Sequence, residues 1–219
     1  MSDASPIWSR PERGSRGPQP THSRDEIVRA AIGLAGADGL AAVSMRAVAA
    51  ALGTGAGTLY RHLSSRDDLL DLMTDRVIGE LRPYPEPGPD WTESLLDLAR
   101  RQLDLHRRHP WLREVLSRPS ALGPEGLAWF DHCLRVLTPV RCDSAAKFET
   151  LALMTGMVTL FARTGTAAPP PIFTGLDVTA YPHLVAAFGN PGAPRTDLFE
   201  RTLRGLFTAL LAEPGPADL

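Results

Sequence analysis

One short glycine-containing segment constrains the fold of this chain more than any other feature. From Ser44 to Leu63 the sequence is SMRAVAAALGTGAGTLYRHL, with apolar residues at helical spacing on both sides of Gly53. Serine is a preferred N-cap, and glycine is preferred just after a helix because it adopts the left-handed conformation without strain. The segment therefore predicts two short helices joined by a tight turn.

The charge of this segment indicates its partner. In the second helix we expect Leu59 and Leu63 to point inward, with the outward positions taken by Thr58, Arg61 and His62. Between Ser44 and Arg66 there are three arginines and no acidic residue, whereas the whole chain has a formal net charge of -2. A local cationic face on a near-neutral protein fits the phosphates of duplex DNA. The segment is thus predicted to be a helix-turn-helix.

The remainder of the chain is predicted to be helical as well. At 219 residues and 43% hydrophobic content it is long enough to bury a substantial core. No segment alternates with the period of two that is typical of strands, so an all-α fold is expected. Apolar residues at helical spacing, with caps and breakers, predict helices over residues 23–38, 110–118, 124–137, 143–163, 182–188 and 196–212, one from residue 65 through at least 77 and one from residue 90 through at least 103.

The first 22 residues are rich in Pro, Gly, Ser and Arg, and we expect a disordered arm. This arm is either a solvated tail or a basic segment that brings Arg10, Arg13 and Arg16 to DNA. It contains no apolar signal segment, and Cys133 and Cys142 are interpreted as reduced thiols, so a cytoplasmic protein is expected. The longest apolar run, Leu151 to Ala162, is too short to cross a membrane, and no membrane partner is predicted.

The front of the chain resembles the DNA-binding half of the tetracycline-repressor (TetR) family. The resemblance is carried by Gly39-Leu40, Arg46 to Ala49, Leu52-Gly53, Thr58 to Leu63 and Arg66 to Leu70, and more loosely by His109 to Leu112 and Tyr181 to Leu184. It implies a three-helix DNA-binding domain over residues 23–68 and a helical ligand-binding and dimerisation domain over residues 69–219. The expected DNA partner is a double-stranded operator.

The same resemblance implies which residues contact DNA. Arg46 occupies a position where the family often contacts guanine, which an arginine can bind through O6 and N7. Tyr60 and His62 occupy phosphate-contacting positions, although packing inside the three-helix core remains an alternative for both. Small residues at the start of the second helix leave little side chain for base contacts there. The predicted DNA-binding residues are Ser44, Arg46, Gly55, Ala56, Gly57, Thr58, Tyr60, Arg61, His62 and Arg66.

A ligand cavity in the second domain is also implied by the resemblance. Over residues 124–137, Leu127, Leu134 and Leu137 are expected to form the core face, and Trp129, His132 and Cys133 a partly polar cavity wall. Arg82 and Glu114 occupy the positions of the histidine pair that holds the metal-bound drug in tetracycline repressors, so a larger apolar or aromatic effector, such as a polyketide, is favoured. The candidate ligand-binding residues, for which plain core packing is the alternative, are His106, Trp111, Glu114, Trp129, His132, Cys133, Met154, Met157, Phe161 and Phe173.

A homodimer is predicted from surplus hydrophobicity. The helices over residues 143–163 and 196–212 carry apolar residues on more faces than one core can cover. Pairing both across a two-fold axis would form a four-helix interface and would place two DNA-binding helices on a pseudo-palindromic site. The candidate dimerisation residues are Phe148, Leu151, Thr155, Phe199, Leu203, Leu206, Phe207 and Leu210.

Catalysis is not predicted. The chain contains neither a Gly-x-Ser-x-Gly nor a Gly-Lys-Ser/Thr motif, and its histidines lack partners at zinc spacing, so no catalytic residue, metal site or cofactor is expected. The predicted function is a ligand-responsive, homodimeric repressor that a small hydrophobic or aromatic effector releases from its operator. The alternative is a constitutive or activating DNA-binding regulator whose cavity is filled by side chains.

Overall fold

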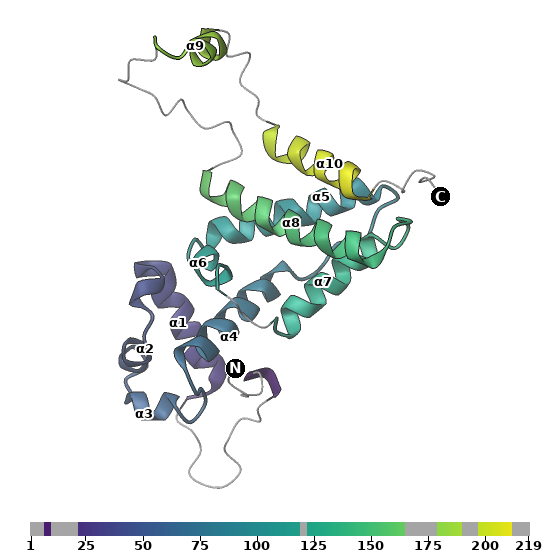
Figure 1. Cartoon of the computed structure of the whole chain (residues 1–219). Coiled ribbons are helices and arrows are strands. Elements are labelled where there is room, and N and C mark those ends of the chain that lie inside the picture. Colours follow the sequence, from purple (N-terminus) through teal and green to yellow (C-terminus); the bar gives the residue numbers. More distant parts are fainter. Residues whose placement is uncertain (1–6, 10–21, 119–121, 165–178, 190–196, 212–219) are drawn as a thin grey trace. The chain divides into compact units, whose positions relative to one another are not determined.

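The computed structural model describes residues 7–9, 22–118, 122–164, 179–189 and 197–211, and every regular element in these ranges is helical (Figure 1). The all-α prediction is confirmed. Contacts divide the chain into two compact units, one formed by residues 1–87 and 104–136 and the other by residues 88–103 and 137–219. The helix α5 (Trp91–Arg108) contributes to both units. Phe173 and the arginines of the N-terminal arm lie outside the described residues.

The first unit begins with the helices predicted around the glycine turn. A capping box between Ser23 and Glu26 starts α1 (Arg24–Asp38), and Gly39, at a φ of 78°, ends it. Next come α2 (Met45–Ala51), the very short α3 (Ala56–Leu59) and α4 (Arg66–Ile78). The core shared by these helices is fully apolar and is formed by Ile27, Ala31, Val48, Leu59, Leu63, Leu69 and Met73.

Two further helices of the first unit, α6 (Leu112–Leu116) and α7 (Pro124–Val136), pack against α4. The predicted core face of α7 is confirmed at Leu137, which is buried just after the helix, but not at Leu127. Leu127 is 58% exposed, whereas Trp129, His132 and Cys133 are buried. The expectation that Leu127 belongs to the core is therefore wrong, because α4 and the segment after it cover the Trp129 side of the helix.

The second unit is built on α5, α8 (Ser144–Thr164) and α10 (Leu198–Leu211). The pair α8 and α10 packs closely, with the Phe161 and Phe199 rings edge to face at 5.2 Å and Trp91 of α5 6.4 Å from Phe207. The short helix α9 is formed by Pro182–Gly189. Val185 in this helix and Tyr181, just before it, are exposed.

By length and composition, α8 is the one helix among the described residues that could cross a membrane. It has 21 residues, and its most apolar window has a mean hydropathy of 1.2. The helix is therefore longer than the run from Leu151 to Ala162, and the prediction that this region is too short to cross a membrane does not hold by length alone. A core helix in a globular protein meets the same criteria.

Candidate DNA-binding surface and regulatory core

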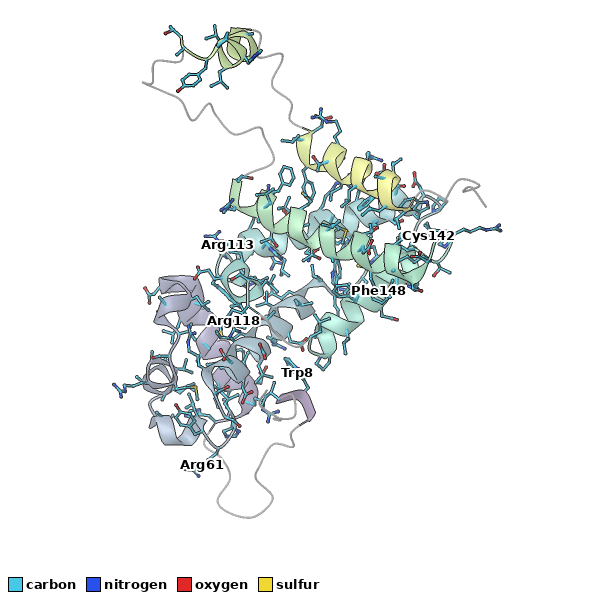
Figure 2. All side chains as sticks on the ribbon, in the orientation of Figure 1. Trp8, Arg61, Arg113, Arg118, Cys142 and Phe148 are labelled. Carbon is cyan, nitrogen blue, oxygen red and sulfur yellow. The ribbon has the colours of Figure 1, made fainter. Side chains whose placement is uncertain are left out.

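The helix pair α2–α3 has the caps that the sequence predicts. The Ser44 hydroxyl accepts a hydrogen bond from the Ala47 amide at 3.1 Å, and Gly53 turns the chain with a φ of 66°. Because a side chain at that φ is strained, glycine sets the geometry of the turn. Within the described residues, Arg46 and Arg61 are exposed and have no acidic partner, and Figure 2 shows Arg61 at the outer end of this region. We call Arg46 and Arg61 the cationic face.

Helix α3 is shorter than predicted and begins with little side-chain support. Its N-cap, Gly55, makes no side-chain capping bond, and its residues are Ala56 to Leu59. The Thr54 hydroxyl donates to the Thr58 hydroxyl at 3.1 Å, which ties the turn to the helix. Gly55 and Gly57 are exposed and bring the backbone, rather than side chains, to the surface. The start of α3 therefore offers little side chain to any partner at this surface.

The predicted outward orientation of His62 is wrong. His62 is 6% exposed, and neither of its ring nitrogens has a hydrogen-bond partner among the described residues. Tyr60, in contrast, is 55% exposed. The packing alternative that the sequence left open for both residues therefore applies to His62 alone, because the chain leaves α3 in a turn that directs residue 62 under Leu59.

Arg66 was predicted to contact DNA, but its guanidinium is already used within the fold. Its Nε donates to the Val43 carbonyl at 2.7 Å, and a terminal nitrogen donates to the Leu40 carbonyl at 3.0 Å. Arg66 therefore fastens the segment before α2 to the start of α4. This correction follows from tertiary contacts between residues more than 20 positions apart, which no local pattern reveals.

Helix α4 also carries acidic groups that the sequence analysis missed. The carboxylate of Asp75 is buried and accepts hydrogen bonds from the Glu125 and Gly126 amides at 2.9 and 3.0 Å, so it caps the start of α7. Burial raises the pKa of Asp75, and the two amide hydrogen bonds oppose that rise. In the sequence, Asp75 interrupts the apolar residues on one side of α4. This interruption could have indicated that its carboxylate has a structural role.

A second polar link joins α4 to α6. Arg118, after α6, forms an ion pair with Asp67 and a longer one, at 3.6 Å, with Asp71. Because Asp67 and Asp71 are one turn apart, both carboxylates face the same guanidinium. Two contacts, through Asp75 and through Arg118, therefore join α4 to α7 and α6.

The part of the first unit that follows α4 buries several polar atoms without partners. Among the described residues these include the Tyr84 hydroxyl, Nδ1 of His106, Nε1 of Trp111 and Nε2 of His132. The Tyr84 ring stacks 4.8 Å from His132 and lies 5.7 Å from Trp129. Buried polar groups are normally hydrogen-bonded, so these unpaired atoms are candidates for hydrogen bonds to a bound molecule.

Burial also fixes the charge of this region. It lowers the pKa of His106 to about 4 and also lowers that of His132, so both imidazoles are neutral near pH 7. Burial raises the pKa of the Cys133 thiol to about 12. The groups around Tyr84, His106 and His132 therefore offer hydrogen bonds rather than charge.

The predicted ligand-binding residues fall into three groups. His106, Trp111, Trp129, His132 and Cys133 are buried in the first unit. Met154 and Phe161 are buried in the second unit, where Met157 is half-buried. Glu114 is exposed on α6, which contradicts its assignment to a cavity wall, because the buried side of that short helix is formed by Leu112 and Val115.

Half of the predicted dimerisation residues are core residues of their own chain. Leu151, Phe199, Leu203 and Phe207 are at most 4% exposed, because α8 and α10 cover them. Assigning these four to an interface is therefore wrong. Phe148 is 52% exposed, while Thr155, Leu206 and Leu210 are half-buried.

The outer side of α8 exposes apolar side chains that the sequence analysis did not select. Leu153 and Leu160 are 44% and 42% exposed and lie two turns apart. Phe148 lies at the other edge of the same surface, and Figure 2 labels it. The exposed small residues Ala152 and Gly156 lie between these side chains. We call Phe148, Leu153 and Leu160 the apolar stripe.

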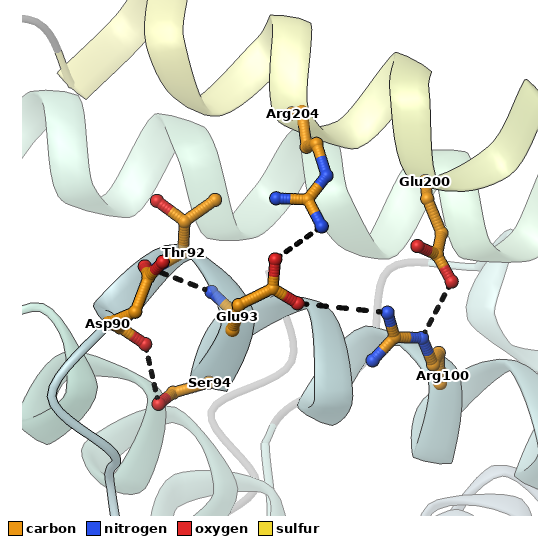
Figure 3. A network of polar contacts seen from close by, with 7 residues as sticks. All are labelled: Asp90, Thr92, Glu93, Ser94, Arg100, Glu200 and Arg204. Carbon is orange, nitrogen blue, oxygen red and sulfur yellow. Dashed lines mark hydrogen bonds and ion pairs between the residues drawn. The ribbon is translucent and has the colours of Figure 1, made fainter. Parts of the chain in front are cut away.

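Two arginines of the second unit, Arg100 and Arg204, form ion pairs, unlike those of the cationic face. Arg100 donates to Glu200 at 2.9 Å and lies 4.0 Å from Glu93, which also pairs with Arg204 (Figure 3). The Asp90 carboxylate caps the start of α5 by accepting from the Thr92 amide at 2.8 Å. This network joins α5 to α10 and leaves these two arginines with acidic partners.

Comparison with known sequence families identifies both parts of the chain. Residues 27–73 match the family described as "Bacterial regulatory proteins, tetR family". Residues 84–169 match the "Tetracyclin repressor-like, C-terminal domain".

Two curated relatives are named as regulators. The transcriptional repressor DrrR1 of Streptomyces coeruleorubidus is 38% identical over 72% of this chain and 58% of its own length. An HTH-type transcriptional regulator of Saccharopolyspora erythraea is 40% identical over 56% of this chain and 51% of its own length. The chain thus spans little more than half the length of these relatives.

The fold is also found in solved structures. Apo ActR from Streptomyces coelicolor has a TM-score of 0.73 and 30% identity, covering 87% of this chain and 95% of that protein. The same TM-score is found for ActR, described as a TetR family protein, in complex with actinorhodin, at 29% identity over 87% of this chain and 97% of that one.

Proposed function

This chain belongs to the tetR family of bacterial regulatory proteins, and from that premise we propose that it is a homodimeric repressor whose release from DNA is controlled by a small molecule. Members of this family are DNA-binding transcription regulators rather than enzymes. The observation that carries the proposal is the cationic face, where Arg46 and Arg61 are exposed without acidic partners in a chain of formal net charge -2.

Contact with DNA is proposed for the cationic face and its surroundings. Arg46, next to the N-cap of α2, is the proposed base-contacting side chain, because arginine can bind guanine through two hydrogen bonds. Tyr60, Arg61 and the exposed backbone of Gly55 and Gly57 are proposed to contact phosphates. We assign no DNA contact to the buried ring of His62 or to the guanidinium of Arg66.

Dimerisation is proposed through the apolar stripe of α8. Exposed apolar side chains flanking small residues allow two helices to approach closely, and a two-fold axis would bury the same surface on each copy. In this proposal a second copy of the chain, rather than lipid, covers the exposed apolar residues of α8. A dimer would place two α3 helices on successive major grooves and would require a pseudo-palindromic operator. We expect it to act in the cytoplasm, where chromosomal DNA is found.

The effector is proposed to be a small, largely aromatic or apolar molecule with hydrogen-bonding groups. Support comes from the aromatic rings of Tyr84, Trp111 and Trp129 and from the unpaired polar atoms beside them. Because His106 and His132 are neutral near pH 7, a neutral ligand fits this region better than a strongly charged one. The structure of ActR with actinorhodin further supports control by a small molecule.

Selection of duplexes from a random-sequence pool tests the proposal directly. The full chain should enrich a pseudo-palindrome whose half-sites are about one helical turn apart. A thermal-shift screen of aromatic compounds should then find one that raises the melting temperature and reduces binding to the selected duplex. Failure to enrich any sequence would refute DNA-specific regulation. Enrichment without a stabilising and releasing compound would favour the constitutive or activating regulator instead.

A further inference from the structure

Near the N-terminus the fold buries Ile7 and half-buries Trp8. Ile7 and Trp8 form a short 3-10 turn, Ile7–Ser9, and Ile7 is only 3% exposed. The sequence around this pair is polar and predicted to be disordered, so the burial is a specific contact rather than a general collapse of the arm. We call the turn Ile7–Ser9 the N-terminal anchor.

The anchor lies where three helices of the first unit meet. Trp8 lines a cavity of about 320 Å³ together with residues of α1, α4 and α7, which are Arg24, Asp25, Val28, Leu72, Asp75, Arg76 and Glu125. Figure 2 shows Trp8 beside these helices. Most of α1 and α4 lies within the part that matches the tetR DNA-binding family, whereas α7 lies within the part that matches the regulatory domain.

At this junction Trp8 packs directly on the cap that joins α4 to α7. A methyl group at Gly123 would lie 2.3 Å from Oδ1 of Asp75 and 2.7 Å from Cη2 of Trp8. The carboxylate of Asp75 and the indole of Trp8 therefore both lie against the side of Gly123 where a Cβ would point, and they leave no room for a side chain there. The same oxygen of Asp75 accepts the Glu125 and Gly126 amide hydrogens, so the indole lies beside the group that makes these hydrogen bonds.

We propose that the N-terminal anchor fixes α4 against the start of α7 and that Trp8 is thereby a positioning residue for operator binding. This inference depends on the proposed function. Only Ser64 and Ser65 separate α4 from Leu63, the last core residue of the α3 region, so a shift of α4 moves the DNA-binding helices with it. Without the indole, α4 samples more positions, and ordering it on DNA costs affinity.

The test uses the full chain and a duplex selected by it from a random pool. Trp8→Ala should weaken binding to this duplex about 5- to 10-fold, whereas Trp8→Phe, which keeps an aromatic ring but lacks the Cη2 edge near Gly123, should lose less than Trp8→Ala. Gly123→Ala should reproduce the loss without any change in the N-terminus, because its methyl group has no room. The double variant should be no weaker than the worse single variant, since both disrupt one joint.

Two further readouts separate positioning from other roles. The salt dependence of binding should be unchanged in Trp8→Ala but shallower in a variant with Arg10, Arg13 and Arg16 all changed to Ala if that segment contacts phosphates. Hydrogen exchange of the Glu125 and Gly126 amides should be at least about tenfold faster in Trp8→Ala, because the indole beside their acceptor is removed. A shallower salt slope in Trp8→Ala would instead show loss of phosphate contacts and would overturn the inference.

The remaining outcomes distinguish this inference from the proposed function. If the unaltered chain selects a duplex and Trp8→Ala binds it within twofold, the positioning role is refuted and the regulator stands. If the unaltered chain prefers no sequence, both fail together. Circular dichroism at the assay temperature ensures that each variant is folded, and Trp8→Phe provides the comparison if Trp8→Ala proves unstable.

Discussion

The two units differ in one surface each, the cationic face of the first and the apolar stripe of the second. In the first unit Arg46 and Arg61 are exposed without acidic partners, whereas in the second unit Arg100 and Arg204 are paired with Glu93. The outer side of α8 in the second unit exposes Leu153 along with other apolar groups. An unpaired cationic face attracts a polyanion, and an uncovered apolar stripe attracts another apolar surface. This difference supports the proposed DNA contact of the first unit and the proposed dimer contact of the second.

The largest effect is expected from breaking the apolar stripe. Leu153→Arg should convert the dimer to a monomer at micromolar concentration, as measured by light scattering. Affinity for the selected duplex should then fall by about 10²- to 10⁴-fold, because the second half-site is no longer bound at high effective concentration. Leu127→Arg, at a leucine of the first unit that is 58% exposed, is the matched control and should stay dimeric.

Acid should destabilise the first unit through His106. Its pKa is lowered from 6.5 to about 4 in the folded chain, so the unfolded chain binds the extra proton between these values. Stability due to this group is therefore complete above about pH 6.5 and decreases as the pH falls toward 4, by about 3 kcal/mol in all. Urea denaturation at several pH values measures this loss, and His106→Gln should remove its share of the pH dependence. The exposed ion pairs of the second unit should contribute far less.

Removing the base-contacting arginine should reduce sequence preference. Arg46→Ala is expected to cost about 1–3 kcal/mol on the selected duplex and much less on random DNA, because a bidentate contact to guanine is lost. Arg113→Ala removes another exposed arginine of the first unit, on α6, and should leave selectivity intact. Fluorescence anisotropy with both duplexes measures the difference, and an Arg46→Ala variant with full selectivity would contradict the assignment.

The smallest effect is expected at Tyr60. Tyr60→Phe should weaken binding to selected and random duplexes equally, by about 1 kcal/mol, since it removes one hydrogen bond to a phosphate. Tyr181→Phe, at a tyrosine of similar exposure in the second unit, is the control and should have no effect. A loss restricted to the selected duplex would mean that Tyr60 contacts a base.

Much of the DNA-binding region could be predicted from local patterns. The N-cap at Ser44 and the turn at Gly53 depend on residues adjacent in sequence, and the structure has both. Residues whose surroundings come from distant segments were predicted less well. Arg66 contacts carbonyls more than 20 positions away, and His62 is covered by neighbouring helices. The residue type alone did not reveal whether a side chain already had contacts within the fold.

The sequence by itself determined an all-helical chain, because caps, glycines and the helical repeat act over a few residues. It also determined the cationic face, since no acidic residue lies between Ser44 and Arg66. Only the tertiary structure decided which face of α7 and of α8 is covered, because both helices have apolar residues on several sides and packing selects among them. It alone brought Trp8 and Asp75 to the start of α7, since contacts between distant segments leave no periodic signal.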